Sequence, residues 1–139
     1  MCRTNSLHLE SKAAPAACLI KSNGKLLAIK GHDDDGWNLP NHKLQKSISA
    51  QCTAHLAVWK TTGLNVEVGN LLFTAQNQTQ YFACALTDDF SSELKTFPVP
   101  SWANRKTSHI SLIDPFNTQQ SQWISDINLI DVRVAYNQL

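Results

Sequence analysis

The amino-acid sequence predicts a single α/β (α+β) domain in which a β-sheet carries at least one helix. Three observations lead to this prediction. The chain has 139 residues, which suits one domain of ordinary size. Asn23-Gly24 separates two apolar runs, a pattern typical of a β-hairpin. Residues 49–62 contain neither glycine nor proline, and small or apolar residues recur there at helical spacing between segments rich in β-forming residues.

The first third of the chain predicts two strands and a loop. We expect antiparallel strands within Ala17–Lys30, because Asn-Gly provides the positive φ angles that a tight hairpin turn needs. Gly31–Gly36 is polar and without periodicity, so it predicts a loop. Trp37–Pro40 follows as a short extended piece, since proline rules out a helix there. Residues 1–13 are expected to be a flexible N-terminal segment of the single domain 1–139.

The helix has recognisable signals at both ends. Ser47 or Ser49 can cap its N-terminus by accepting a backbone hydrogen bond. Gly63 is placed to end the helix in the left-handed conformation, which other residues adopt less readily. We therefore expect one helix from about Ser49 to Thr62.

The sheet is expected to continue after this helix. The segments 64–74 and 80–86 are rich in β-forming residues and are separated by a polar loop, which predicts a second hairpin. His109–Ile113 is a further expected strand. The stretch Ser121–Asn137 is expected to form a closing helix, interrupted by residues typical of loops.

Composition excludes several classes of partner. Twelve basic and eleven acidic residues leave a net charge of +1, so we expect neither nucleic acid nor an anionic membrane as a partner. No stretch approaches the roughly 20 apolar residues that span a bilayer. Residues 1–12 are polar, which is not the pattern of a basic segment followed by an apolar one. A cytoplasmic location is expected, and export stays open.

The four cysteines do not predict a metal site. Cys2, Cys18, Cys52 and Cys84 form no CxxC pair, and their separations fit neither a zinc ribbon nor a zinc finger. Cys18 and Cys84 lie in apolar, strand-like runs, where a free cysteine behaves as a small buried hydrophobe. We expect that role for them, with a disulfide as the alternative.

A local but ordered set of motifs resembles the Nudix (MutT-like) hydrolase superfamily. Residues 37–44, WNLPNHKL, match its W-x-L-P-G-G-K-V segment, and the helix ends in Thr-Gly-Leu before a strand. The superfamily signature is G-x5-E-x7-R-E-U-x-E-E-x-G-U, where U is apolar; anchoring its end on Gly63-Leu64 places its start at His42. The resemblance runs from about Ala14 to Leu86. It implies an α/β/α sandwich with a mixed β-sheet and a loop-helix-loop signature segment.

The same alignment shows that every ionisable signature position is replaced. The first glycine, early glutamate, arginine and three helical glutamates correspond to His42, Ile48, Leu56, Ala57, Lys60 and Thr61. In the superfamily those glutamates share one helix face and hold the divalent cations that activate water. Alanine, lysine and threonine do not provide such ligands. The resemblance therefore implies a degenerate member, with no catalytic or metal-binding residue at these positions and no cofactor.

Six residues are candidates for binding a ligand in such a domain: Lys30, Trp37, His42, His55, Trp59 and Lys60. The two lysines could pair with phosphate as point charges, although for Lys60 a solvated residue on the helix face is the favoured interpretation. The tryptophans could stack on a base or simply pack. Each histidine could act as an acid or base, or lie at the surface, because no partner is tied to it by spacing.

Two functional hypotheses follow. The first is a binding or regulatory module that recognises a nucleotide-like small molecule or a protein partner without hydrolysing it. The alternative is an active hydrolase of a nucleoside diphosphate linked to another moiety, with Mg²⁺ or Mn²⁺ held outside the signature helix by Asp33, Asp34, Asp35 or Glu67. A purely structural domain and a homodimer are further possibilities.

Overall fold

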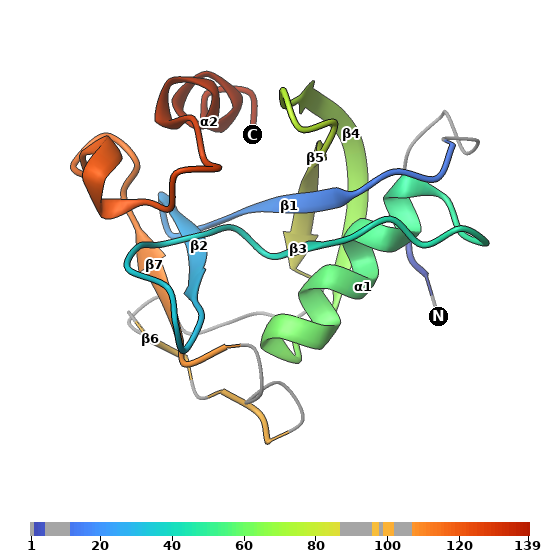
Figure 1. Ribbon diagram of the computed structural model, residues 1–139, viewed down its shortest axis with the longest axis horizontal. Coiled ribbons are helices and arrows are strands. Elements are labelled where there is room, and N and C mark those ends of the chain that lie inside the picture. The colour runs from blue at the N-terminus through green and yellow to red at the C-terminus, as the bar shows by residue number, and fades with distance from the viewer. Residues whose placement is uncertain (1, 5–11, 87–95, 98, 102–106) are drawn as a thin grey trace.

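The computed structural model describes residues 2–4, 12–86, 96–97, 99–101 and 107–139, and it places a mixed sheet between two helices (Figure 1). The elements are β1 Ala16–Ser22, β2 Lys25–Lys30, β3 Asn41–His42, α1 Ala50–Thr62, β4 Val66–Thr74, β5 Gln80–Leu86, β6 Thr96–Phe97, β7 His109–Ile113, a 3₁₀ turn Gln120–Gln122 and α2 Leu129–Tyr136. The strand order is β4-β5-β1-β2-β7-β6, with β3 paired to β1.

Strand β1 organises the sheet. It runs parallel to β5 on one side and antiparallel to β2 and β3 on the other. Ala16 to Ile20 are all buried, because each face of this strand is covered. A strand covered on both faces reads as a continuous apolar run, which is what the sequence has here. The mixed α/β prediction is confirmed.

The two helices lie on opposite faces of the sheet, and each covers its own core. Val66, Val68 and Phe82 pack toward α1, whereas Tyr81 packs with Leu129 of α2. Because successive side chains of a strand point to opposite faces, β5 contributes to both cores. Among the helices of the described residues, none has the length and apolar character needed to span a bilayer.

Local sequence signals account for the hairpin and the first helix. Asn23 and Gly24 have φ of 53° and 75°, as the predicted turn requires. Ser49 caps α1, since its Oγ accepts a hydrogen bond of 3.2 Å from the Cys52 N–H. Gly63 ends the helix at φ 73°, and its N–H donates to the Trp59 carbonyl at 2.9 Å. Both predictions are confirmed.

The C-terminal helix is shorter than predicted. The sequence suggested Ser121–Asn137, but α2 covers only Leu129–Tyr136. Asn128 starts it, because its Oδ1 accepts from the N–H groups of Ile130 and Asp131. Before this cap the chain forms a 3₁₀ turn at Gln120–Gln122, a bridge from Trp123 to Trp37 and a turn at residues 125–126.

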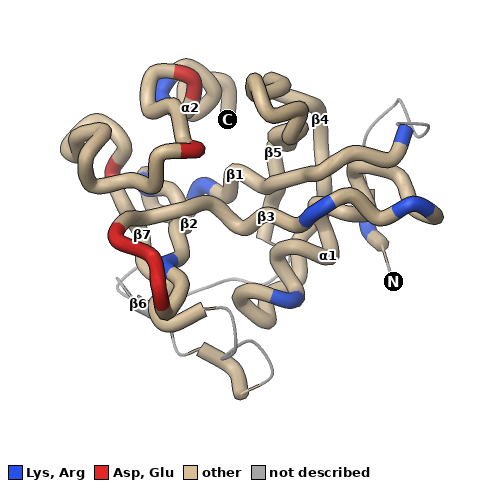
Figure 2. Tube along the Cα trace, in the orientation of Figure 1, with Lys and Arg blue, Asp and Glu red and all other residues tan. Residues whose placement is uncertain are grey.

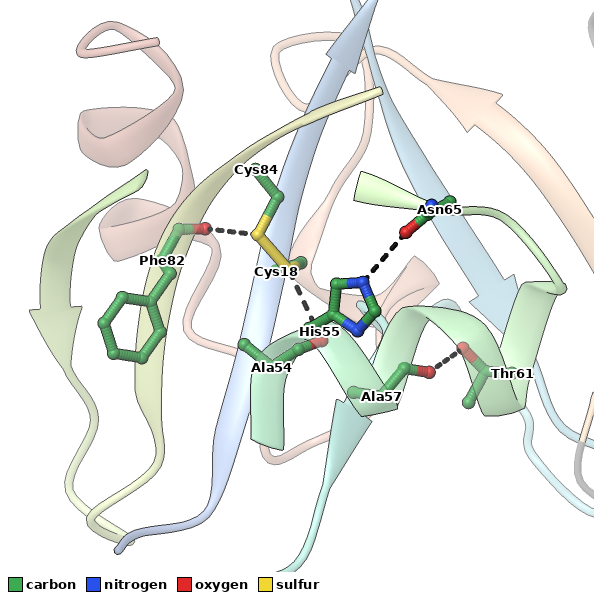
Figure 3. The surroundings of a disulfide bond; sticks show 8 residues. All are labelled: Cys18, Ala54, His55, Ala57, Thr61, Asn65, Phe82 and Cys84. Carbon is green, nitrogen blue, oxygen red and sulfur yellow. Dashed lines mark hydrogen bonds between the residues drawn. A yellow bond between two sulfur atoms is a disulfide. The ribbon is translucent and has the colours of Figure 1, made fainter. Parts of the chain in front are cut away.

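The cysteines form two disulfides, so the interpretation of Cys18 and Cys84 as free thiols is wrong. Cys18 pairs with Cys84 across a sequence separation of 66, and Cys2 pairs with Cys52 across a separation of 50. The first bond joins neighbouring strands β1 and β5 under α1 (Figure 3). The parallel pairing brings their α-carbons to 5.6 Å, which spacing along the chain does not reveal.

Part of the expected flexible segment 1–13 is tied to the domain. The Val68 N–H donates to the Arg3 carbonyl at 2.9 Å, and Thr4 forms a parallel bridge with Val68. The disulfide of Cys2 fastens the same segment to α1. Residues 5–11 lie outside the described residues.

Candidate functional site

A cavity of about 250 Å³ lies between the loop after β2, strand β3 and the last turn of α1. Its polar lining residues are Asp34, Asn38, Asn41, His42, Lys43 and Thr61. His42 corresponds to the first glycine of the signature considered above, and Thr61 corresponds to its last glutamate. The cavity therefore lies where the sequence resemblance places the superfamily's loop-helix-loop segment.

Backbone hydrogen bonds fix the segment that lines this cavity. Asn38 and Ile29 exchange two of them, at 2.8 Å and 2.7 Å, and the Cys18 N–H donates to the Pro40 carbonyl at 3.0 Å. These bonds attach residues 37–40 to the sheet, although proline prevents a regular ladder. Asn41, His42 and Lys43 follow immediately, so their positions are set by the sheet.

The asparagine side chains are held by the same short segment. Asn38 Oδ1 accepts from the Leu39 N–H at 2.8 Å, and Asn41 Nδ2 donates to the Leu39 carbonyl at 2.8 Å. His42 is buried, and its Nδ1 lies 2.9 Å from the Lys43 carbonyl oxygen. The same Nδ1 lies 3.2 Å from Gln45 Nε2, so two neighbours hold the imidazole in place. The polar lining is thus oriented before any ligand arrives.

Charges of both signs meet at this cavity. Lys43 is exposed and brings an ammonium group, whereas Asp34 brings a carboxylate whose Oδ2 accepts from the Gly31 N–H at 3.1 Å. Lys30 and Trp37 do not line it. They pair with each other beside it, with Lys30 Nζ 4.5 Å from the centre of the Trp37 ring.

The helix positions facing this region do not fit a divalent cation. Ala57 is fully buried and offers no ligand atom. Thr61 is 5% exposed, and its hydroxyl donates to the Ala57 carbonyl at 2.7 Å. Lys60 is exposed and would repel a cation. Magnesium prefers carboxylate oxygens, and these three side chains supply none. No three His, Cys, Asp or Glu residues gather in a metal-binding group within the described part of the chain.

The four carboxylates considered as replacement ligands are not equivalent. Only Asp34 lines the cavity, while Asp33 and Asp35 are exposed outside it. Glu67 lies between Val66 and Val68, which both pack toward α1, so its side chain is on the opposite face of the sheet. There it lines a separate hollow with Lys21. Glu67 is therefore excluded as a ligand at this cavity.

The remaining candidates of the helix lie away from the cavity. His55 is buried, and its Nε2 is 2.8 Å from Asn65 Oδ1 in the loop after α1 (Figure 3). Trp59 is 46% exposed and, like Lys60, does not line the cavity. In contrast, the sequence analysis did not select Asn38, Asn41 or Lys43. The WNLPNHKL motif contained all three, but side-chain direction depends on the bridges to β1 and β2.

The comparisons with known proteins agree with this geometry. The chain is 32% identical to a MutT-like protein of Streptomyces ambofaciens over 65 residues. These residues make up 47% of this chain and 42% of that protein. An ADP-ribose pyrophosphatase from Streptococcus suis superposes with a TM-score of 0.71 at 13% identity over 92% of both chains. The chain thus shares its fold with Nudix hydrolases of known structure and a local stretch of sequence with a MutT-like protein.

Two further solved structures are similar to this chain. A UDP-X diphosphatase matches with a TM-score of 0.70 at 16% identity, covering 94% of this chain and 64% of its own. A Nudix hydrolase from Nitrosomonas europaea matches with a TM-score of 0.67 at 14% identity, covering 94% and 73%. The chain thus spans less than half of the MutT-like protein and under two thirds of the UDP-X diphosphatase. No protein-family model matches it.

Proposed function

We propose that this Nudix-like domain binds the phosphate of a nucleotide-like small molecule in the cavity beside Thr61 and does not hydrolyse it with a divalent metal. The observation that carries the proposal is the lining of that cavity. It combines the Lys43 ammonium with two asparagine amides, at the helix turn where Ala57 and Thr61 stand in place of carboxylates.

The chemistry of these groups suits a phosphate that needs no bridging metal. Lys43 can pair with phosphate oxygens as a point charge. Asn38 uses its Oδ1 on the Leu39 N–H, so its amide NH₂ can donate to a ligand. Lys30, stacked on Trp37, adds a second positive charge nearby. The two ammonium groups replace part of the positive charge that metal ions supply elsewhere in the superfamily.

The similar structures suggest which ligands to test. Two of them are named a UDP-X diphosphatase and an ADP-ribose pyrophosphatase. Both names describe a nucleoside diphosphate linked to another group. We therefore propose that ligand class for this chain, as a bound molecule that is not cleaved.

The test is calorimetric titration of ADP-ribose and a UDP-sugar with chelator present. We expect saturable binding that weakens roughly five- to tenfold in Lys43→Gln, because one charged contact to phosphate is lost. Lys46→Gln is the matched control, since Lys46 is an equally exposed lysine that does not line the cavity. Equal weakening in both variants, or no binding by the unchanged protein, would contradict the proposal.

One observation supports an active hydrolase as the second candidate. Asp34 lines the cavity and is the only loop aspartate among residues 33–35 that does so. If Asp34 helped to hold Mg²⁺ or Mn²⁺, turnover would require the metal and would fall in Asp34→Asn but not in Asp33→Asn. Turnover unaffected by Asp34→Asn would exclude Asp34 as a metal ligand, and the absence of metal-dependent turnover would exclude the hydrolase.

The disulfides also bear on where the protein works. Two disulfides favour an oxidising compartment, because cytoplasmic thiols are usually kept reduced. We therefore propose an exported location in place of the cytoplasmic one expected from sequence. A protein partner and a homodimer stay predictions.

A further inference from the structure

A second cavity, of about 310 Å³, lies on the other face of the sheet, between the β4–β5 hairpin and the start of α2. Tyr81 on its wall belongs to the core shared with α2, whereas the next residue, Phe82, packs toward α1. The hairpin lies beside α2 in Figure 1. The proposed nucleotide cleft does not involve this cavity.

One wall of this second cavity is aromatic and includes a tyrosine that is buried as a whole residue. Phe73 and Tyr81 stack with ring centres 4.5 Å apart and planes within 5°. Tyr81 is 5% exposed, and its hydroxyl has no hydrogen-bond partner among the described residues. A buried phenol normally finds such a partner. This hydroxyl is therefore available to a ligand.

The opposite wall is acidic. Asp126 and Asp131 line the cavity, and neither pairs with a basic side chain in the described part of the chain. Figure 2 shows acidic segments at and just before α2. Burial, followed by the charges of Asp126 and Asp131, raises the pKa of Tyr81 to about 12, so both carboxylates act on the phenol. The dipole of α2 favours Asp131 in its first turn, but Asp126 lies outside the helix.

We propose that this cavity binds an organic cation, namely a guanidinium or primary ammonium group on a short alkyl chain. The N–H groups of such a cation donate to the two carboxylates and to the phenol oxygen. Its alkyl chain packs against the aromatic wall formed by Phe73 and Tyr81. A metal ion suits the cavity less well, because that wall offers it few ligand atoms and two carboxylates do not complete a coordination shell.

The test compares butylguanidinium with butylurea, an uncharged molecule of nearly the same shape. We expect butylguanidinium to bind saturably and to shift the ring resonances of Phe73 and Tyr81, and butylurea to bind at least about tenfold more weakly. Binding should weaken about tenfold in Asp126→Asn and further in the double variant with Asp131→Asn. Asp33→Asn is the matched control, because Asp33 is an exposed aspartate outside the cavity.

Asp126 is exposed and caps no helix, so Asp126→Asn tests the site even if the double variant folds poorly. Equal affinity for butylguanidinium and butylurea, or unchanged affinity in Asp126→Asn, overturns the proposal. Binding of a tripeptide with a central arginine and blocked ends is then compared with binding of butylguanidinium, to distinguish a cation on a protein from a free small molecule. Binding tighter than that of butylguanidinium assigns the site to an arginine of a protein partner, and weaker binding assigns it to a free small molecule. The proposal is also overturned if neither butylguanidinium nor the arginine tripeptide binds.

Discussion

At the scale of single residues, two of the three helix positions aligned with signature glutamates, Ala57 and Thr61, are part of the packing. Ala57 is fully buried, and Thr61 is bonded to the Ala57 carbonyl one turn earlier. Threonine makes this internal bond readily in a helix, which satisfies its hydroxyl without a ligand. Lys60, between them in sequence, points outward and is exposed. A single substitution would thus have different effects at neighbouring signature positions.

We predict that Ala57→Glu lowers the free energy of unfolding by on the order of 3 kcal/mol, because it buries a carboxylate where no partner is present. Lys60→Glu is the control in the same helix. It should change the free energy of unfolding by no more than about 0.5 kcal/mol, since Lys60 is exposed. Urea unfolding of both variants measures the difference. Wild-type stability in Ala57→Glu would show that this position can open to solvent.

Tyr81 gives the residue-scale prediction for pH. Its pKa is raised from 10.0 to about 12, first by burial and then by Asp126 and Asp131. The folded protein therefore holds the phenolic proton more tightly than the unfolded chain does. The resulting stabilisation is fully present below pH 10 and is lost as the pH rises from about 10 to about 12.

The measurement is the near-ultraviolet absorbance of tyrosinate in Tyr136→Phe, which leaves Tyr81 as the only tyrosine of the two in the chain. We expect ionisation near pH 12 in the folded protein, and an earlier transition when the protein is unfolded in urea. Ionisation near pH 10 in the folded state would mean that the phenol is not buried beside the carboxylates.

At the scale of elements, the loop before the cavity is positioned by a close backbone approach. A Cβ atom on Gly36 would lie 2.6 Å from the backbone carbon of Trp123. This contact allows the Trp37 N–H to donate to the Gln122 carbonyl and the Ile124 N–H to donate to the Trp37 carbonyl, each at 2.9 Å. Residues 122–124, after β7, therefore support the loop that ends at Gly36 and lines the cavity.

Gly36→Ala should accordingly lower the free energy of unfolding by about 1–3 kcal/mol, because the backbone of Trp123 must move. It should also weaken ligand binding in the adjacent cavity. Asp35→Ala is the neighbouring control, since Asp35 is exposed and its loss should cost no more than about 0.5 kcal/mol. Thermal unfolding of the two variants compares them. Equal melting temperatures would contradict the close approach.

Elements with short-range signals were predictable, and those fixed by distant contacts were not. Asn23-Gly24 and Gly63 required positive φ, so the hairpin and the end of α1 followed from local sequence. The start of α2 depended on Asn128 acting as a cap, which competes with other polar residues nearby. The cavity lining depended on bridges between residues 29 and 38, which no local pattern encodes. The identity of the signature positions was predictable, but their burial was not.

At the scale of the whole molecule, the disulfides join parts of the chain that are far apart in sequence. Cys18–Cys84 closes a long loop across the centre of the sheet, and Cys2–Cys52 fastens the N-terminal segment to α1. Cross-links across long loops restrict the unfolded chain most, so the first bond is expected to matter more for stability.

We predict that Cys18→Ala with Cys84→Ala lowers the free energy of unfolding by about 2–4 kcal/mol. Cys2→Ala with Cys52→Ala should have a smaller effect, because that bond lies nearer the N-terminus. Alkylation without reductant, followed by mass spectrometry, checks that protein from an oxidising host carries no free thiol. Four alkylated cysteines in that sample would contradict both the disulfides and the proposed compartment.

At the scale of the whole molecule, the two cavities proposed as binding sites lie on opposite faces of one sheet, so the proposed phosphate site near α1 is separate from the proposed cation site near α2. The central claim concerns the cavity beside Thr61, near α1. Its most direct test is phosphate or nucleotide release from nucleoside triphosphates, ADP-ribose, nucleotide sugars and dinucleoside polyphosphates, with Mg²⁺, Mn²⁺ or chelator. The account predicts no metal-dependent turnover together with binding that Lys43→Gln weakens. Turnover that requires metal, persists through rigorous purification and is lost in Asp34→Asn would contradict it.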